Sequence, residues 1–394
     1  MIDAVYTATK MKKELTDIVA AYEQNIRTGT GMVLATVVHV EGSSYRRPGA
    51  RMLVDETGKI TGAISGGCLE GDALRKALMA LHQQQNKLVS YNSMEEDDAT
   101  FGIQLGCNGI VHILFEPIHP QDANNPVACL QQAIQERKEA VLVTLFSLQA
   151  THNQQPGTCY LLTKENTVSS ALPTTLETVV AAKALQVLLT KTSLFADNIN
   201  QQALSAFIEF VSPAVALHII GAGNDAMPLV HMAKQLGWQV SVMDGRNHLV
   251  TQTRFPLADH LVVGKPEQII HDISKDEWSV VVMMTHNYNY DLALLPLLLK
   301  HSLRYIGMLG PKRRMERLLN ELVQQGCTIT AAQQQHLYGP VGLDIGAETS
   351  EEIALSVLAE IKAVLSYRNG YSLRYRQEAI HPRSNSTTEA TEHS

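Results

Sequence analysis

The chain has 394 residues, which is enough for two or three domains with cores of their own. Hydrophobic residues make up 45% and charged residues 18%, so we expect most of the chain to fold. A net charge of −7 argues against nucleic-acid binding, and no stretch has the apolar length of a membrane span. The five cysteines form no CxxC pair, which favours neither a disulfide framework nor a zinc site and predicts a reduced, cytoplasmic location.

The beginning of the chain predicts a helix followed by a small sheet and a second helix. Apolar spacing indicates an amphipathic helix over residues 11–26. Apolar runs bounded by turn residues then predict strands at 32–38, 51–54 and 59–64, and leucines at helical spacing predict a helix over 69–81.

Two polar segments lie at the ends of these elements: residues 42–49 (GSSYRRPG) and residues 65–72 (SGGCLEGD). Glycine amides can approach an anion closely, and a helix N-terminus favours both negative charge and a thiolate. These segments therefore predict an anion-binding site, with a glycine-rich hairpin and a buried cysteine as the alternative. The candidate residues are Ser43, Ser44, Arg46, Arg47, Gly66, Gly67, Cys68 and Glu70.

The same scaffold recurs about a hundred residues later, where residues 141–146 align without gaps with residues 33–38. The second copy keeps the hydrophobic pattern and loses the polar residues. Residues 43–47 align with Thr-His-Asn-Gln-Gln, and residues 65–68 align with Pro-Thr-Thr-Leu. Because the scaffold can be built without the arginines, paired glycines and thiol, their presence in the first copy favours a binding site.

Between the two copies, residues 87–91 and 110–115 predict two further strands. Cys107 stands between glycines just before the second of these strands, which makes it a second small, reachable thiol. The proline-containing residues 117–126 are typical of a linker. The second copy is expected to end with helices over 175–191 and 197–211.

From Val215 onward the pattern changes to alternating strands and helices. A buried-strand run over 215–220 precedes the G-x-G-x-x-A turn that begins at Gly221 and Gly223, and the next strand ends in Asp244. This is the pattern of a dinucleotide-binding unit, in which the acid holds a ribose hydroxyl. The fold is therefore predicted to be Rossmann-like, while the occupancy of its crevice stays open.

Other candidates lie further along this half. Thr285 and His286 follow a strand at 279–284, and the carboxyl ends of parallel strands face the ligand crevice. Arg313 and Arg314 lie at a predicted helix N-terminus, where cations oppose the helix dipole, and this indicates a bound anion or else solvated arginines.

These patterns predict an α/β protein with an internal repeat in its N-terminal α/β region and a C-terminal Rossmann-like, doubly wound parallel sheet. The expected domains are the N-terminal unit at 1–117, the degenerate second repeat at 118–212, the Rossmann-like domain at 213–368 and a mobile polar tail at 369–394.

The chain resembles the XdhC/CoxI family of xanthine dehydrogenase accessory proteins, cytoplasmic factors that bind molybdenum cofactor and deliver it to a molybdenum hydroxylase. The resemblance covers roughly residues 11–117 and 213–368. The motifs that carry it are residues 41–49, 65–72, 105–109, 305–310 with Arg313-Arg314, and 342–347 with 351–354.

The resemblance implies that molybdenum cofactor, in its molybdopterin form or with a nucleotide extension, binds to the N-terminal motifs. The arginines at 46–47 would then hold its phosphate by charge-assisted hydrogen bonds. The amides around residues 66–67 would bind phosphate or molybdenum oxo oxygens. Cys68 or Cys107 would contact molybdenum as a soft thiolate or guard its terminal sulfido group.

Two classes of function stay open. The first is a cofactor-insertion chaperone, rather than an enzyme, that protects molybdenum cofactor during sulfuration by a cysteine desulfurase. It would insert the cofactor into the apo-form of a xanthine dehydrogenase-like hydroxylase, and a homodimer stays open. The second is an NAD(P)-dependent oxidoreductase based on Gly221, Gly223 and Asp244, which no Tyr-Lys or His-Asp hydride-transfer set accompanies.

Overall fold

The computed structural model describes residues 4–7, 12–92, 109–135, 137–169, 172–199 and 203–377. Cys107 and residues 378–394 of the predicted polar tail lie outside these ranges. The chain forms two compact units, unit 1 over Met1–Pro213 and unit 2 over Ala214–Ile380. No helix within the described ranges is both long and apolar enough to cross a membrane.

The helices and strands of unit 1 are β1 (Ala4–Thr7), α1 (Lys12–Thr28), β2 (Met32–Gly42), β3 (Arg51–Asp55), β4 (Ile60–Gly62), α2 (Glu70–Gln83), β5 (Lys87–Asn92), β6 (Gly109–Pro117), α3 (Pro126–Gln135), β7 (Ala140–Phe146), β8 (Gly157–Thr163), β9 (Thr167–Ser169), α4 (Thr174–Thr190), β10 (Thr192–Ile199) and β11 (Leu204–Val211). Most of the predicted elements are present within a residue or two of their expected ends.

The two antiparallel sheets in the described part of unit 1 have the same strand order. The first is β4-β3-β2-β6-β5, and the second is β9-β8-β7-β11-β10 with β1 added beside β10. The pairing register agrees as well, because Leu34 faces Leu53 in the first sheet and Leu142 faces Leu161 in the second. This shared topology is what the predicted repeat requires.

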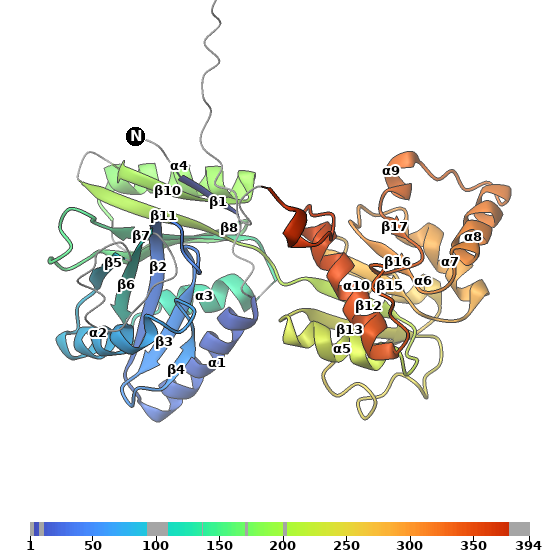
Figure 1. Ribbon diagram of the computed structural model, residues 1–394, viewed down its shortest axis with the longest axis horizontal. Coiled ribbons are helices and arrows are strands. Elements are labelled where there is room, and N and C mark those ends of the chain that lie inside the picture. The colour runs from blue at the N-terminus through green and yellow to red at the C-terminus, as the bar shows by residue number, and fades with distance from the viewer. Residues whose placement is uncertain are drawn as a thin grey trace, which may run out of the picture. The chain divides into compact units, whose positions relative to one another are not determined.

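The sheets of unit 1 pack face to face between helices (Figure 1). Helix α2 covers the outer face of the first sheet, and α4 covers the second. Helices α1 and α3 pack against each other and fill one end of the space between the sheets. Phe146, Phe195 and Phe207 fill another part of that space. Both repeats therefore contribute to one shared core.

Two buried glutamates at matching strand positions cross between the sheets. Glu209 of β11 pairs with the guanidinium of Arg51 in β3, with Nη1 3.2 Å from Oε1, and both side chains are 1% exposed. Glu116 of β6 accepts hydrogen bonds from Thr158 of β8, 2.6 Å from the amide and 3.1 Å from Oγ1. Each repeat thus places one acid against a polar partner of the other.

The pH dependence of stability should carry the signature of Glu116. Burial raises the pKa of this carboxyl to about 7, against the hydrogen bonds from Thr158 and the charge of Arg51. A raised native pKa means that the folded chain holds this proton more tightly than the unfolded chain does. The free energy of unfolding therefore decreases as the pH rises from about 4.5 through about 7. We expect Glu116→Gln to remove this loss, which amounts to at most about 3 kcal/mol.

The measurement is urea unfolding followed by far-UV circular dichroism at pH 5.5 and pH 8.5. The advantage of Glu116→Gln over the parent chain should grow toward pH 8.5. Glu165→Gln changes an exposed carboxylate and serves as the control. A pH-independent difference between Glu116→Gln and the parent would contradict a raised pKa.

One predicted helix is wrong. Residues 197–211 contain the end of β10 and all of β11, because Leu204–Val211 pairs with β7 on one side and β10 on the other. Pairing within the sheet overrides the local helical pattern of this segment. Helix α3 begins at Pro126, the last residue of the predicted linker at 117–126. Its apolar face completes the core with α1.

The helices and strands of unit 2 are β12 (Ala216–Ile220), α5 (Ala226–Gln235), β13 (Gln239–Asp244), β14 (His260–Val263), α6 (Pro266–Ile269), β15 (Ser279–Met283), α7 (Tyr288–Leu298), β16 (Ile306–Met308), α8 (Lys312–Gln324), α9 (Ala331–Gln334), β17 (Leu337–Tyr338), α10 (Ser350–Leu365) and the 3-10 turn η2 (Leu373–Tyr375). The sheet is parallel throughout, in the order β14-β13-β12-β15-β16-β17. This order confirms the predicted Rossmann-like, doubly wound sheet.

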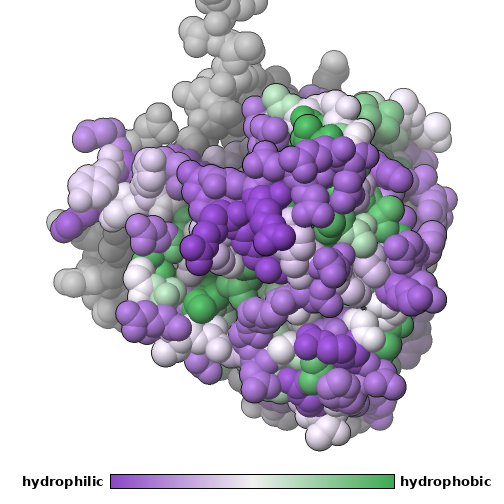
Figure 2. Space-filling view, turned by 90° about the vertical axis from the view of Figure 1, so that its right-hand side faces the viewer, coloured by the Kyte–Doolittle hydropathy of each residue, from purple (hydrophilic) through white to green (hydrophobic). Residues whose placement is uncertain are grey.

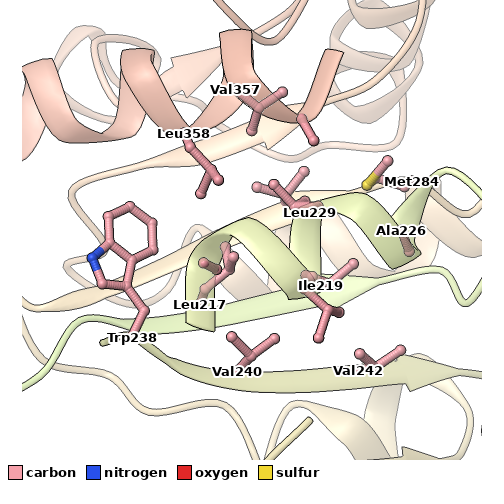
Figure 3. Packing of buried hydrophobic residues seen from close by; sticks show 14 of the residues in the cluster. Leu217, Ile219, Ala226, Leu229, Trp238, Val240, Val242, Met284, Val357 and Leu358 are labelled. Atoms are coloured by element: carbon pink, nitrogen blue, oxygen red, sulfur yellow. The ribbon is translucent and has the colours of Figure 1, made fainter. Parts of the chain in front are cut away.

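Helices cover both faces of this sheet. Helices α5 and α10 pack on one face, where Leu229 and Leu358 meet Leu217 and Ile219 of β12 (Figure 3). Helices α6, α7 and α8 pack on the other face. The central strands β12, β13, β15 and β16 are mostly buried, which explains why they are rich in apolar residues. The order of the strands reverses between β12 and β15, and this point is where Rossmann folds form their ligand crevice.

Candidate functional site

The two polar segments of the first repeat lie side by side in unit 1. We call residues 43–47 and 65–68 the first-repeat loops. The ring of Tyr45 in one loop lies about 3.4 Å from the position that a Cβ atom would take at Gly66 in the other. Gly66, Gly67 and Cys68 are exposed, and Gly67 has a φ of 111°. The structure therefore brings together the residues that distinguish the first copy from the second.

Ser65 holds the second of these loops in shape. Its Oγ accepts hydrogen bonds from the amides of Gly67 and Leu69, both at 3.1 Å, and it donates to Glu70. The other Glu70 oxygen accepts from the amide of Ser65 at 2.8 Å. Although burial opposes the charge, these hydrogen bonds lower the pKa of Glu70. Glu70, at the start of α2, is thus bonded twice to Ser65, and Cys68 in the same loop is exposed.

Arg46 is oriented by a residue outside both loops. Its Nη2 donates to Oε2 of Glu14 in α1, and the two side chains are 22% and 17% exposed. The other carboxylate oxygen of Glu14 lies 3.4 Å from the amide of Arg51. Helix α1 therefore ties the first loop to the start of β3. An anion bound by Arg46 would share the guanidinium with Glu14.

The corresponding loop of the second repeat is closed by its own side chain. Gln155, which aligns with Arg47, is 2% exposed. Its amide nitrogen donates to the carbonyls of Ala150 and Asn153, at 2.9 and 3.0 Å, and its oxygen accepts from the amide of Ser147 at 2.7 Å. A residue that stabilises the loop thus replaces one that is suited to an anion.

In unit 2, the glycine turn lies at the crevice between β12 and β15. A Cβ atom at Gly221 would collide with the carbonyl of Met284, and Gly221 has a φ of 120°. Thr285 donates from Oγ1 to Asp291 at 2.6 Å, and Arg314 donates from Nη2 to the other Asp291 oxygen, also at 2.6 Å. Two predicted candidates are therefore joined through one buried acid.

The remaining candidates of unit 2 have different surroundings. Asp244 is 5% exposed and is bonded to Arg246, which follows it by two residues. His286 lies 3.0 Å from Asp225 of the glycine turn. Arg313 is exposed near the start of α8. Figure 2 shows a face of the molecule on which hydrophilic residues predominate. Arg313 thus lies apart from the contacts made by Arg314.

Sequence reasoning missed three charged residues of these sites: Glu14, Asp225 and Arg246. Asp225 lies inside the glycine turn, and Arg246 follows the predicted ribose acid by two residues, so the positions of both within these motifs were a signal. Glu14 had no such signal, because its contact with Arg46 joins residues 32 positions apart. Within the described ranges, no three His, Cys, Asp or Glu residues gather as a metal site.

Two family models match the chain. The model described as XdhC and CoxI family matches residues 26–92, which include both first-repeat loops. The model described as XdhC Rossmann domain matches residues 217–361 in unit 2. The two matches fall on the two regions that carry the candidate sites, and they agree with the resemblance identified from the motifs.

Relatives match over most of the chain. A Bacillus subtilis protein, named as a probable subunit of xanthine dehydrogenase, is 33% identical, covering 84% of this chain and 92% of the relative. The Escherichia coli molybdenum cofactor insertion chaperone PaoD is 25% identical over 86% of this chain and 85% of its own length. A crystal structure from Bacillus halodurans, described as that of a xanthine dehydrogenase, is 31% identical with a TM-score of 0.71, covering 90% and 97%. This chain belongs to the XdhC and CoxI family.

Proposed function

We propose that this chain is an accessory chaperone that binds molybdenum cofactor, protects it during sulfuration and inserts it into a xanthine dehydrogenase-type apo-enzyme. The names of the two relatives support the general role, since one is named for such an enzyme and the other is called a cofactor insertion chaperone. A cysteine desulfurase would supply the sulfur, and a molybdenum hydroxylase would receive the cofactor.

The observation that carries this proposal is the pairing of the first-repeat loops. The two loops that carry the polar residues absent from the second repeat are in contact, because Tyr45 of one loop lies against Gly66 of the other. The equivalent loop of the second repeat, closed by Gln155, supports a scaffold role there. This contrast within one chain supports a binding role for the polar residues of the first repeat.

The chemistry of the loops fits a phosphorylated pterin that carries a metal. The amides of Gly66 and Cys68 have no acceptor among the described residues, so they are available to phosphate or oxo oxygens. Arg46 adds a cation in the adjoining loop, and the exposed Cys68 adds a soft ligand of the kind that molybdenum accepts. The ring of Tyr45 offers a flat surface to the pterin.

Replacing Cys68 with alanine tests this assignment. If the thiol contacts the cargo, we expect Cys68→Ala to lower the affinity for molybdenum cofactor by about tenfold or more. The chain would be loaded with cofactor under anaerobic conditions, and bound molybdenum and pterin would be quantified separately by mass spectrometry and by fluorescence of the oxidised pterin. Transfer is read from the activity of an apo-hydroxylase after mixing.

Cys327→Ala is the matched control, because Cys327 is a half-buried free cysteine in unit 2. It should bind the cofactor as the parent chain does. Full affinity in a Cys68→Ala, Cys107→Ala double variant would remove the thiol from the site. Absence of any pterin binding by the parent chain would refute the chaperone role itself.

A further inference from the structure

The Rossmann-like sheet of unit 2 is typical of proteins that bind a dinucleotide, and such a ligand needs particular residues in the crevice. Its pyrophosphate lies over the second glycine of the turn, where a missing side chain gives room. Its ribose hydroxyls bind to an acid at the end of the second strand. Gly223 and Asp244 hold these two places in unit 2, and charged side chains of the chain itself already contact both.

The space over Gly223 is taken by Asp225. A Cβ atom at Gly223 would collide with Oδ1 of Asp225, so the carboxylate folds back over the glycine. The other oxygen, Oδ2, lies 3.0 Å from Nε2 of His286. His286 comes from the end of β15, on the opposite side of the crevice, and has a φ of 54°. A pyrophosphate would meet the Asp225 carboxylate at this place instead of open space.

The hydroxyl-binding capacity of Asp244 is used by Arg246. Oδ1 accepts from the amide and Nε of Arg246, at 2.9 and 3.0 Å. Oδ2 accepts from Nη2 of Arg246 and from the amide of Ala222, both at 2.8 Å. Burial opposes its charge, yet these hydrogen bonds lower the pKa of Asp244, which keeps it an acceptor only. A ribose diol has to displace the guanidinium in order to reach the carboxylate.

A second arginine fastens the same turn. Nη2 of Arg254 donates to the side-chain oxygen of Asn224 at 2.8 Å, and Nη1 donates to the carbonyl of Leu249 at 3.3 Å. Asn224 stands between Gly223 and Asp225 in the chain. The contacts of Arg254, His286 and Asp244 with residues 222–225 thus hold the glycine turn in place, which favours a turn that stays closed.

We infer that the crevice of unit 2 is closed to nicotinamide dinucleotides by its own side chains, with Asp225 in place of the pyrophosphate and Arg246 in place of the ribose diol. Asp225 and Arg246 are therefore the residues that exclude these nucleotides from the crevice. The glycine turn serves the packing of β12 against β15, as the close approach of Gly221 to Met284 requires. This inference is independent of the proposed pterin site in unit 1.

The test is a gain of binding. The parent chain, Asp225→Gly, Arg246→Ala and the double variant would be dialysed to equilibrium against NADH and, separately, NADPH. We expect the parent to bind neither nucleotide with a Kd below about 1 mM, and the double variant to bind with a Kd of about 0.1 mM or less, with the single variants between. Lys234→Ala, which breaks the ion pair between Lys234 of α5 and Asp259 before β14, should behave as the parent does.

Both tryptophans, Trp238 and Trp278, lie in unit 2, so their fluorescence reports whether each variant is folded. Arg246 is half-exposed, so the single variant Arg246→Ala keeps the test usable if the double variant unfolds. Micromolar binding of either nucleotide by the parent would overturn the inference. So would folded variants that gain no affinity. Pterin loading of unit 1, measured on the same variants, should be unchanged.

Discussion

Replacing Arg51 with methionine is expected to lower the free energy of unfolding of unit 1 by about 3 to 5 kcal/mol. Arg51 and Glu209 are each 1% exposed and bonded through both carboxylate oxygens. Methionine fills a similar volume but leaves Glu209 as a buried charge without a counter-ion. Glu116 also loses the cation that favours its ionised form. The pair joins the two repeats, so the whole of unit 1 should be affected.

The structure supplies its own readout for this variant. Unit 1 contains no tryptophan, because both lie in unit 2. In urea unfolding, the far-UV circular dichroism transition should therefore move to lower denaturant while the tryptophan fluorescence transition stays in place. Lys13→Met breaks an exposed ion pair and should cost at most about 1 kcal/mol. A loss below about 1 kcal/mol in Arg51→Met would contradict the role of a buried, inter-repeat ion pair.

Replacing Gly221 with alanine is expected to destabilise unit 2 by about 3 kcal/mol. Two costs combine at this position. The φ of 120° is unfavourable for any residue with a Cβ atom, and that atom would collide with the Met284 carbonyl. The clash is with backbone rather than with a flexible side chain, so β12 and β15 would have to separate. Tryptophan fluorescence during urea unfolding measures the effect directly.

Gly326→Ala separates these two costs. Gly326 has a φ of 85°, and nothing lies within 4 Å of the place its Cβ atom would take. Its substitution should cost only the backbone term, about 1 kcal/mol. Equal losses for the two variants would show that the approach of the glycine turn to β15 contributes nothing. Nucleotide binding should be absent from Gly221→Ala and Gly326→Ala alike.

The strands and helices of unit 2 were predictable because hydrophobic periodicity is a local property. The buried strands of the parallel sheet are rich in apolar residues, and the glycine turn separates the first strand from α5 at the expected place. Whether the crevice can bind a dinucleotide was not predictable in the same way. Asp244 occupies the expected position, yet its partner is Arg246, and the motif alone does not reveal that pairing.

Unit 1 illustrates a different failure. The segment at 197–211 was predicted as a helix from local pattern, although the first repeat has two strands, β5 and β6, after its helix. Applying the repeat consistently would have predicted β10 and β11. Strand assignment depends on which neighbours a segment pairs with, and β11 is central in its sheet. Local propensity is therefore least reliable where pairing on both sides decides the conformation.

The charged residues at the centre of unit 1 were also beyond sequence reasoning, though a signal existed. Glu116 and Glu209 each interrupt an apolar strand, and Arg51 begins another. A charge in a buried strand has to find a partner, because leaving it unpaired is costly. The sequence indicates that these charges need partners, but it does not indicate that Arg51 pairs with Glu209, 158 positions away.

The sequence by itself determined which copy of the repeat keeps the glycines, arginines and thiol, and where the glycine turn begins, since both are statements about residue order. Only the tertiary structure decided that Tyr45 meets Gly66, that Glu14 orients Arg46, and that Asp225 and Arg246 close the crevice of unit 2. The physical reason is range. Apolar spacing acts over a few residues, whereas hydrogen bonds and ion pairs depend on which strand ends and loops the completed fold brings together.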